Sequence, residues 1–253
     1  MEKKKKKKKS KAVNAVLTVI EIVCICIAGV SGYKIYDAWH QNKTAEDTYD
    51  DLNRKVVSTP DTNTDEKVID WTQLRSINSD IAAWIYQEGT PIDYPVLYAD
   101  SNDEYLRYDI NHNYSVWGVP FIDSSNSHGF TDKNTVIYGH SGYRMSEMFS
   151  TLDNYTDQSY YDAHKELDLY TPDAHYKLYP LAGYETVTSD EYIETSFASD
   201  DDYMSYVNGF ISKSAFKSEQ SITASDQTVL LSTCQFHNTD GRFALLCKMA
   251  KAS

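Results

Sequence analysis

The sequence predicts a mainly β domain with helical additions, preceded by one transmembrane helix. Eight short segments rich in β-branched and aromatic residues, each bounded by turn residues, follow one another without alternating helices. This pattern favours a closed or nearly closed β-barrel of about eight strands over a series of βαβ units. The eight segments are 82–87, 95–99, 117–123, 134–140, 167–171, 175–187, 227–234 and 241–249.

The transmembrane helix is predicted from residues 12–32, which follow a basic tail over residues 1–11. An apolar run of this length spans a hydrocarbon core of about 30 Å at about 1.5 Å per residue. The alternative is a cleaved signal peptide, whose apolar region is shorter, roughly 7–15 residues, and ends at a small-residue cleavage site. No such site follows here, so we expect a single-pass membrane anchor. The lysines before it predict a cytoplasmic N-terminus and an extracellular domain.

Charge divides the chain into a basic N-terminal part and an acidic remainder. The first 32 residues hold eight lysines and two glutamates, so a whole-chain formal charge of −13 leaves −19 on the remainder. Nucleic-acid binding requires clustered Lys and Arg, and so an acidic domain of this kind disfavours it. Residues 33–64 are polar and weakly periodic, and we expect a stalk that leads to a folded domain over 65–253.

Three helical segments are expected within that domain. The first runs from 65 to about 76, where apolar residues have helical spacing: Val68, Ile69, Trp71, Leu74 and Ile77. The second lies around 145–164. The third, 199–216, is a long helix before the penultimate strand, with Asp200 near its N-cap and an apolar face of Tyr203, Met204, Val207, Phe210 and Ile211.

Two of the four cysteines belong to the outer domain, and a disulfide between Cys234 and Cys247 is the first alternative for an exported protein. If 228–234 and 242–249 form a hairpin, Cys234 lies opposite residue 242. Cys247 is then about 16 Å further along at ~3.3 Å per residue, whereas a disulfide needs Cα atoms within about 7 Å. We therefore expect Cys234 to be a free thiol.

A nucleophilic site is predicted where two apolar strands end, at Cys234 and at His140. If these strands are neighbours, both side chains emerge at one rim of the barrel. An imidazole can activate a thiol of ordinary pKa ~8.5 and later protonate a leaving amine. Arg242 on the following strand can stabilise the oxyanion of an acyl transfer. Taken singly, each residue also fits a structural role, with Cys234 as a small buried hydrophobe and His140 as a hydrogen-bonded side chain.

Metal binding is not expected from this sequence. Cys234 and His237 have the spacing of half a zinc site, but no second pair completes four ligands. No acidic cluster has calcium-loop spacing either. We expect neither a metal nor a cofactor.

These motifs together resemble the sortases, the cysteine transpeptidases of Gram-positive bacteria. The resemblance lies in the N-terminal anchor, a strand ending Tyr-Gly-His, a strand ending Leu-Ser-Thr-Cys, and an arginine eight residues later. The helix before the barrel and the long helix at 199–216 resemble class B. Leu230 departs from the family, which usually has Thr there. The resemblance implies a sortase-like closed β-barrel and the catalytic residues His140, Cys234 and Arg242. Ser232 and Thr233, with backbone groups of 121–126, are candidate substrate contacts.

The activity that this resemblance implies is transpeptidation at the outer face of a membrane. Cys234 would cleave a C-terminal sorting signal of secreted proteins after Thr, with a motif similar to Asn-Pro-x-Thr-Asn. An amine of a peptidoglycan precursor or a pilin would then resolve the thioester. Two alternatives stay open: an anchored cysteine protease or amidase that uses water, and a non-enzymatic surface binding domain.

Overall fold

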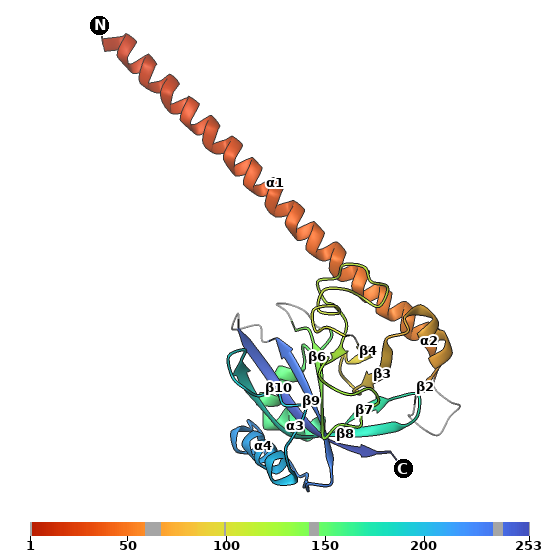
Figure 1. Ribbon diagram of the computed structural model, residues 1–253. Coiled ribbons are helices and arrows are strands. Elements are labelled where there is room, and N and C mark those ends of the chain that lie inside the picture. The colour runs from red at the N-terminus through yellow and green to blue at the C-terminus, as the bar shows by residue number, and fades with distance from the viewer. Residues whose placement is uncertain (1, 59–66, 99, 142–146, 235–239, 253) are drawn as a thin grey trace. The chain divides into compact units, whose positions relative to one another are not determined.

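The computed structural model describes residues 2–58, 67–98, 100–141, 147–234 and 240–252. The chain forms two compact units, Met1–Thr44 and Ala45–Ser253. The first unit is helical and belongs to α1 (Glu2–Val56), drawn in red and orange in Figure 1. This helix contains a window with a mean hydropathy of 2.4, which is long and apolar enough to cross a membrane. The apolar run predicted at 12–32 falls within α1.

A closed barrel of eight strands forms the centre of the second unit. The order around the barrel is β10-β8-β7-β3-β4-β5-β6-β9, and the prediction of an eight-stranded barrel is confirmed. Most neighbours are antiparallel, but β4–β5 and β6–β9 are parallel pairs. The strands are β3 (Ile81–Tyr86), β4 (Asp93–Tyr98), β5 (Phe121–Ile122), β6 (Asn134–Gly139), β7 (Leu167–Tyr170), β8 (His175–Val187), β9 (Gln227–Cys234) and β10 (Gly241–Lys251).

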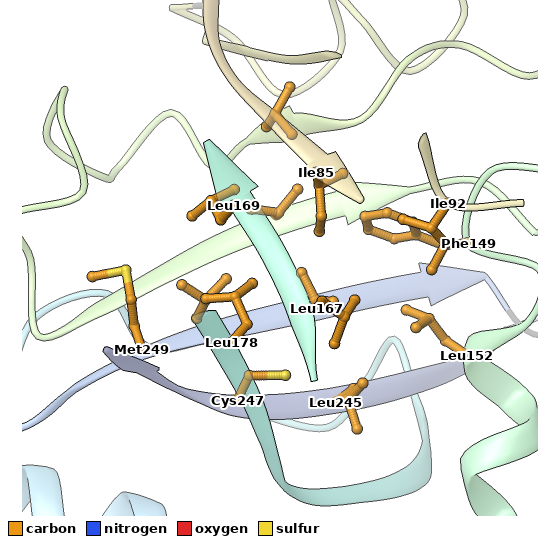
Figure 2. Packing of buried hydrophobic residues seen from close by; sticks show 14 of the residues in the cluster. Ile85, Ile92, Phe149, Leu152, Leu167, Leu169, Leu178, Leu245, Cys247 and Met249 are labelled. Atoms are coloured by element: carbon orange, nitrogen blue, oxygen red, sulfur yellow. The ribbon is translucent and has the colours of Figure 1, made fainter. Parts of the chain in front are cut away.

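Side chains along each strand alternate between the barrel interior and its outer face. On β10, Leu245 and Cys247 pack into the interior, where Figure 2 shows them among apolar side chains of other strands. Ala244 and Leu246 lie in a different cluster, together with side chains of α4 (Asp200–Lys213). This period of two is what a strand buried on both faces requires, because successive side chains point to opposite sides.

The long helix before β9 confirms the third helical prediction. Ser199 caps α4 by accepting a hydrogen bond from the Asp202 amide, so Asp200 is its first residue. The helix buries Tyr203, Val207 and Phe210 on one face. Ile211 differs from the expectation, because it lies at the edge of this face and is 43% exposed.

The first predicted helix is shorter than expected. Val68 and Ile69 do not join it but form β2 (Val68–Ile69), which pairs with β1 (Val57–Ser58). Asp70 then caps α2 (Trp71–Ile77) by accepting a hydrogen bond of 2.9 Å from the Gln73 amide. The strand pairing takes the backbone before Asp70 out of the helical conformation, and of the helix residues only Leu74 is buried.

The second predicted helical region, around 145–164, consists of two short elements. A 3-10 helix, η1 (Leu152–Thr156), is followed by α3 (Gln158–Ala163). Asp157 separates them and caps α3 by accepting a hydrogen bond from the Ser159 amide. Residues 142–146 of the predicted region lie outside the described residues.

The compact unit begins at Ala45, earlier than the expected domain start at residue 65. The segment 33–64, expected as a stalk, is helical as far as Val56. Its last turns bury Ala45, Tyr49, Leu52 and Val56 in one cluster with barrel residues. These four residues are spaced by four, three and four positions, which places them on one helical face. Residues 59–66 lie outside the described part of the chain.

Candidate active site

The backbone register brings the three candidate catalytic residues into one row. In the parallel pair β6–β9, Gly139 is paired with Thr233. The next residues along these two strands are His140 and Cys234, and Cys234 is itself paired with Arg242 of β10. Neighbouring strands lie about 4.8 Å apart. The strands β6 and β9 are therefore neighbours, which is the condition on which the strand-end prediction depends. The Cys234 side chain lies outside the described part of the structure, so the site itself stays a prediction.

His140 is held at the end of β6 by the segment that follows it. Its carbonyl oxygen accepts a hydrogen bond of 3.0 Å from the amide of Phe149. The ring of Phe149, which is fully buried in the barrel interior, lies against Gly139. A Cβ on Gly139 would come within 2.4 Å of Phe149 Cδ2. Only a residue without a side chain fits at this position.

Substitution of Gly139 by alanine tests this packing. We expect Gly139→Ala to lower the free energy of unfolding by about 1–3 kcal/mol, because an added methyl group overpacks a closed core. Urea denaturation of the full chain in detergent measures the change. Gly209→Ala in α4 is the matched control, since its Cβ meets nothing within 4 Å and alanine favours a helix. Equal stabilities of the two variants would contradict the role assigned to Gly139.

The imidazole of His140 is neutral in the folded protein at neutral pH. Burial is the main cause, and the positive charges of Arg107 and Arg242 add to it, so that the pKa of His140 falls from 6.5 to about 4. Arg107 is exposed and donates to the Val116 carbonyl, whereas Arg242 is half-buried. A neutral imidazole can accept a proton, which is what activation of a neighbouring thiol requires.

This shift makes stability dependent on pH. The unfolded chain protonates His140 near pH 6.5 and the folded chain only near pH 4, so the unfolded state binds more protons between these values. Stability is therefore lost as the pH falls through this window, by about 2 kcal/mol at pH 5. Urea denaturation at pH 7 and pH 5 measures it. We expect His140→Asn to show a smaller loss than the unsubstituted protein. An unchanged loss in His140→Asn would contradict the lowered pKa.

Arg242 presents its guanidinium at the start of β10. One nitrogen, Nη1, donates a hydrogen bond of 2.8 Å to the carbonyl of Gly241. A guanidinium has five N–H donors, so this bond leaves others for a bound group. The strand position and the half-buried side chain suit Arg242 to bind an oxyanion or a peptide carbonyl.

A pocket of about 210 Å³ opens beside His140 and Arg242. Its lining is mostly apolar and aromatic, with a few polar groups, as is usual for ligand sites. Besides these two residues, the lining consists of Asn102, Asp103, Tyr105, Leu106, Trp117, Val119, Phe121, Tyr138, Gly139, Ser232 and Thr233.

A buried carboxylate orients two of these pocket residues. Asp123 is 4% exposed and accepts hydrogen bonds of 2.7 Å from the Tyr138 hydroxyl and 3.1 Å from Asn102 Nδ2. Burial alone would raise the pKa of Asp123, but the bonds from Tyr138, Ser125 and Asn102 outweigh it and the pKa is lowered. Asp123 therefore stays ionised and fixes the Tyr138 and Asn102 side chains.

The other site residues predicted from the sequence have different positions. Ser232 and Thr233 line the pocket but are only 2% and 1% exposed. Ser232 Oγ is already hydrogen-bonded to the Tyr192 hydroxyl at 2.9 Å, so these two side chains contribute to its wall more than to open surface. Of the expected segment 121–126, Phe121 lines the pocket. His237, weighed as half of a zinc site, lies outside the described residues.

Cys247 is a free thiol in the barrel interior. It is fully buried, and burial raises the pKa of its thiol well above the ordinary value. Cys247 pairs with Val229 of β9, five residues along that strand from Cys234. This register agrees with the separation predicted for the two cysteines.

Most of the pocket wall was not predicted from the sequence. It comes from the connection between β4 and β5, in particular from Tyr105, Leu106, Trp117 and Val119. For Tyr105 and Leu106 the available signal was the presence of large apolar residues in a polar connection without strand or helix periodicity. Such residues indicate burial but do not say against which surface they pack. The sequence predicts Trp117 and Val119 in a strand over 117–123, but β5 covers only Phe121–Ile122, because the Val119 amide bonds to the Tyr105 carbonyl within the connection.

Comparison with known proteins agrees with this geometry. A family model described as the sortase domain matches residues 85–250. The chain is 31% identical over 231 residues to Sortase B of Staphylococcus aureus, a match that covers 90% of this chain and 94% of that protein. It is 34% identical over 208 residues to Sortase B of Listeria monocytogenes, covering 81% and 83% of the two chains.

Solved structures show the same relationship. A Staphylococcus aureus sortase B–substrate complex aligns with a TM-score of 0.74 at 30% identity, covering 85% of this chain and 100% of that one. A Bacillus anthracis protein described as similar to sortase B aligns with a TM-score of 0.74 at 29% identity, covering 83% and 98%. The chain therefore belongs to the sortase family of cysteine transpeptidases and is similar to its class B members.

Proposed function

We propose that this sortase is anchored in the cell membrane by residues 12–32, with its N-terminus in the cytoplasm and its catalytic domain outside. It cleaves a C-terminal sorting signal of secreted proteins after Thr and transfers the acyl group to an amine of a peptidoglycan precursor or a pilin. The observation that carries this proposal is the row formed by His140, Cys234 and Arg242 beside an apolar pocket. The apolar window of α1 and the lysines before it support the anchor and its orientation.

The first half of the reaction forms a thioester on Cys234. His140, neutral because of its lowered pKa, takes the proton of the thiol as the sulfur attacks the peptide carbonyl carbon. The C–N bond after Thr then breaks, and His140 passes that same proton to the departing amine. The segment of the sorting signal that follows Thr leaves as the free amine, and the protein that now ends in Thr stays attached to Cys234 through a thioester.

The second half transfers the acyl group to the acceptor. The incoming amine attacks the thioester carbonyl, the C–S bond breaks, and the sulfur recovers a proton through His140. In both halves negative charge develops on the carbonyl oxygen. The guanidinium of Arg242 stabilises that oxygen.

The pocket provides the binding surface for the sorting signal. Its aromatic and apolar wall suits the side chains of an extended peptide, and Asn102 and Tyr138 supply oriented polar groups. A sortase B–substrate complex has been solved for the Staphylococcus aureus protein, which supports a peptide substrate here.

Mass spectrometry of the full chain in detergent micelles tests the proposal. The protein is mixed with a panel of sorting-signal peptides, including ones similar to Asn-Pro-x-Thr-Asn, and with amine acceptors, and Cys234→Ala is the control. We expect an acyl adduct on Cys234, cleavage after Thr and a product joined to the amine. The control should show none of these.

Other outcomes separate the alternatives. If the acyl group is transferred only to water, whichever amine acceptor is supplied, the result would favour a protease or amidase over a transpeptidase. Cleavage by Cys234→Ala at the unsubstituted rate would remove Cys234 from the mechanism. Digestion of the lysine tail by protease added outside intact cells would overturn the proposed orientation.

A further inference from the structure

Tyr49, near the end of α1, contacts the connection that forms the pocket wall. Its hydroxyl donates a hydrogen bond of 2.8 Å to the carbonyl oxygen of Gly118. Tyr49 is 5% exposed and belongs to the same apolar cluster as Tyr105 and Trp117. The family match begins at residue 85, so Tyr49 lies outside the matched sortase domain.

At Gly118, two segments of the β4–β5 connection that are distant in sequence come into contact. Gly118 has φ +58, and a Cβ there would come within 2.4 Å of the Tyr105 carbonyl oxygen. The next residue, Val119, donates its amide to the same Tyr105 oxygen at 3.2 Å. Tyr105 and Val119 both line the pocket. The bond from Tyr49 therefore holds the backbone from which the pocket wall extends.

A second set of contacts leads from Tyr49 to His140. The Tyr49 ring packs edge-on against Tyr94, with ring centroids 5.3 Å apart. The Tyr94 hydroxyl accepts a hydrogen bond of 3.2 Å from the amide of Met148, a fully buried residue. Met148 has φ 52, which is uncommon for a residue other than glycine. Phe149, the next residue, donates its amide to the His140 carbonyl.

We propose that Tyr49 is a positioning residue for the transfer reaction, and that the last turns of α1 hold the pocket wall and the His140 backbone in register. This inference rests on the proposed function. The helix that follows the membrane span then does more than separate the domain from the membrane, because it completes the support of the substrate site. Residues 45–56 are accordingly part of the catalytic unit.

A positioning role predicts a different result from a structural one. Loss of a buried hydrogen bond lowers stability wherever the bond is. Loss of this particular bond also loosens the pocket wall, so the KM for the sorting peptide should rise. The value of kcat should change less, because loss of the hydroxyl leaves in place the Tyr49 ring that packs against Tyr94, and with it the contacts that lead to His140.

Tyr49→Phe in the full chain tests the proposal, with Tyr155→Phe as the matched control. Tyr155 is also a buried tyrosine whose hydroxyl donates to a backbone carbonyl, that of His164, but it does not line the pocket. For Tyr49→Phe we expect KM to rise about two- to ten-fold, as the loss of one hydrogen bond implies. Tyr155→Phe should lower the melting temperature and leave KM unchanged.

Hydrogen–deuterium exchange provides a second measurement that needs no substrate. We expect the amides of 105–119 to exchange faster in Tyr49→Phe and at the unsubstituted rate in Tyr155→Phe. Unchanged exchange in 105–119, or equal KM values for the two variants, would overturn the positioning role. If the unsubstituted protein turns over no peptide, the proposed function fails, and the exchange measurement still decides the role of Tyr49.

Discussion

Arg242→Ala is expected to lower kcat by about 10²–10³-fold with a small change in KM, since removal of one oxyanion donor has this effect in acyl transfer. The strand register pairs Arg242 of β10 with Cys234 of β9, so the two residues lie opposite each other on neighbouring strands. The transition state carries more negative charge on the carbonyl oxygen than the bound peptide does, so the loss falls mainly on kcat. Rates of peptide ligation by the full chain measure it.

Arg107→Ala separates this role from a general effect of positive charge. Both arginines lower the pKa of His140, but Arg107 is exposed and is not part of the pocket lining. We expect Arg107→Ala to change kcat only a few-fold. Arg242→Lys should recover part of the loss, because it keeps the charge but not the planar fork. If Arg242→Ala and Arg107→Ala lower kcat equally, Arg242 acts only through its charge at a distance and not as an oxyanion donor.

Removal of residues 45–64 is the second change with a large expected effect. A fragment over 65–253 lacks the buried side chains of Tyr49, Leu52 and Val56, each contributing about 1.5–3 kcal/mol. Their sum is a large part of the roughly 5–15 kcal/mol that stabilises a whole domain. We therefore expect a fragment over 45–253 to unfold cooperatively in urea, and 65–253 to be unfolded or to lose its transition at much lower urea.

Single substitutions on the same helix check this result in the full chain. Leu52 is 3% exposed, and Leu52→Ala should lower the free energy of unfolding by about 2–5 kcal/mol. Lys55 lies in the next turn and is exposed, and Lys55→Ala should stay within about 0.5 kcal/mol. Equal urea midpoints for the fragments 45–253 and 65–253 would show that these helical turns add nothing to the domain.

The strands were predictable because each is short, apolar and bounded by turn residues. The hairpin of β9 and β10 is a local structure, so counting across its turn was enough to place Arg242 opposite Cys234. The position of His140 needed one further condition, that β6 and β9 be neighbours. These strands are parallel and far apart in sequence, and only the closed barrel satisfies that condition.

The last turns of α1 show why other features could not be predicted. Four apolar residues among many charged ones make a weak helical signal, so the sequence predicts a stalk there. Their burial depends on a surface supplied by the β4–β5 connection and by Tyr94. Neither partner is near α1 in the sequence, so no local pattern reveals the contact.

The sequence by itself determined the local elements and the chemistry: the apolar run in α1, the eight strands, and a thiol, an imidazole and a guanidinium at strand ends. Periodicity and residue type carry this information over a few residues at a time. The tertiary structure alone decided the order of strands around the barrel, the neutral state of His140, the pocket wall and the contact of Tyr49 with Gly118. Each of these depends on burial between distant segments, and burial becomes defined only when the barrel closes.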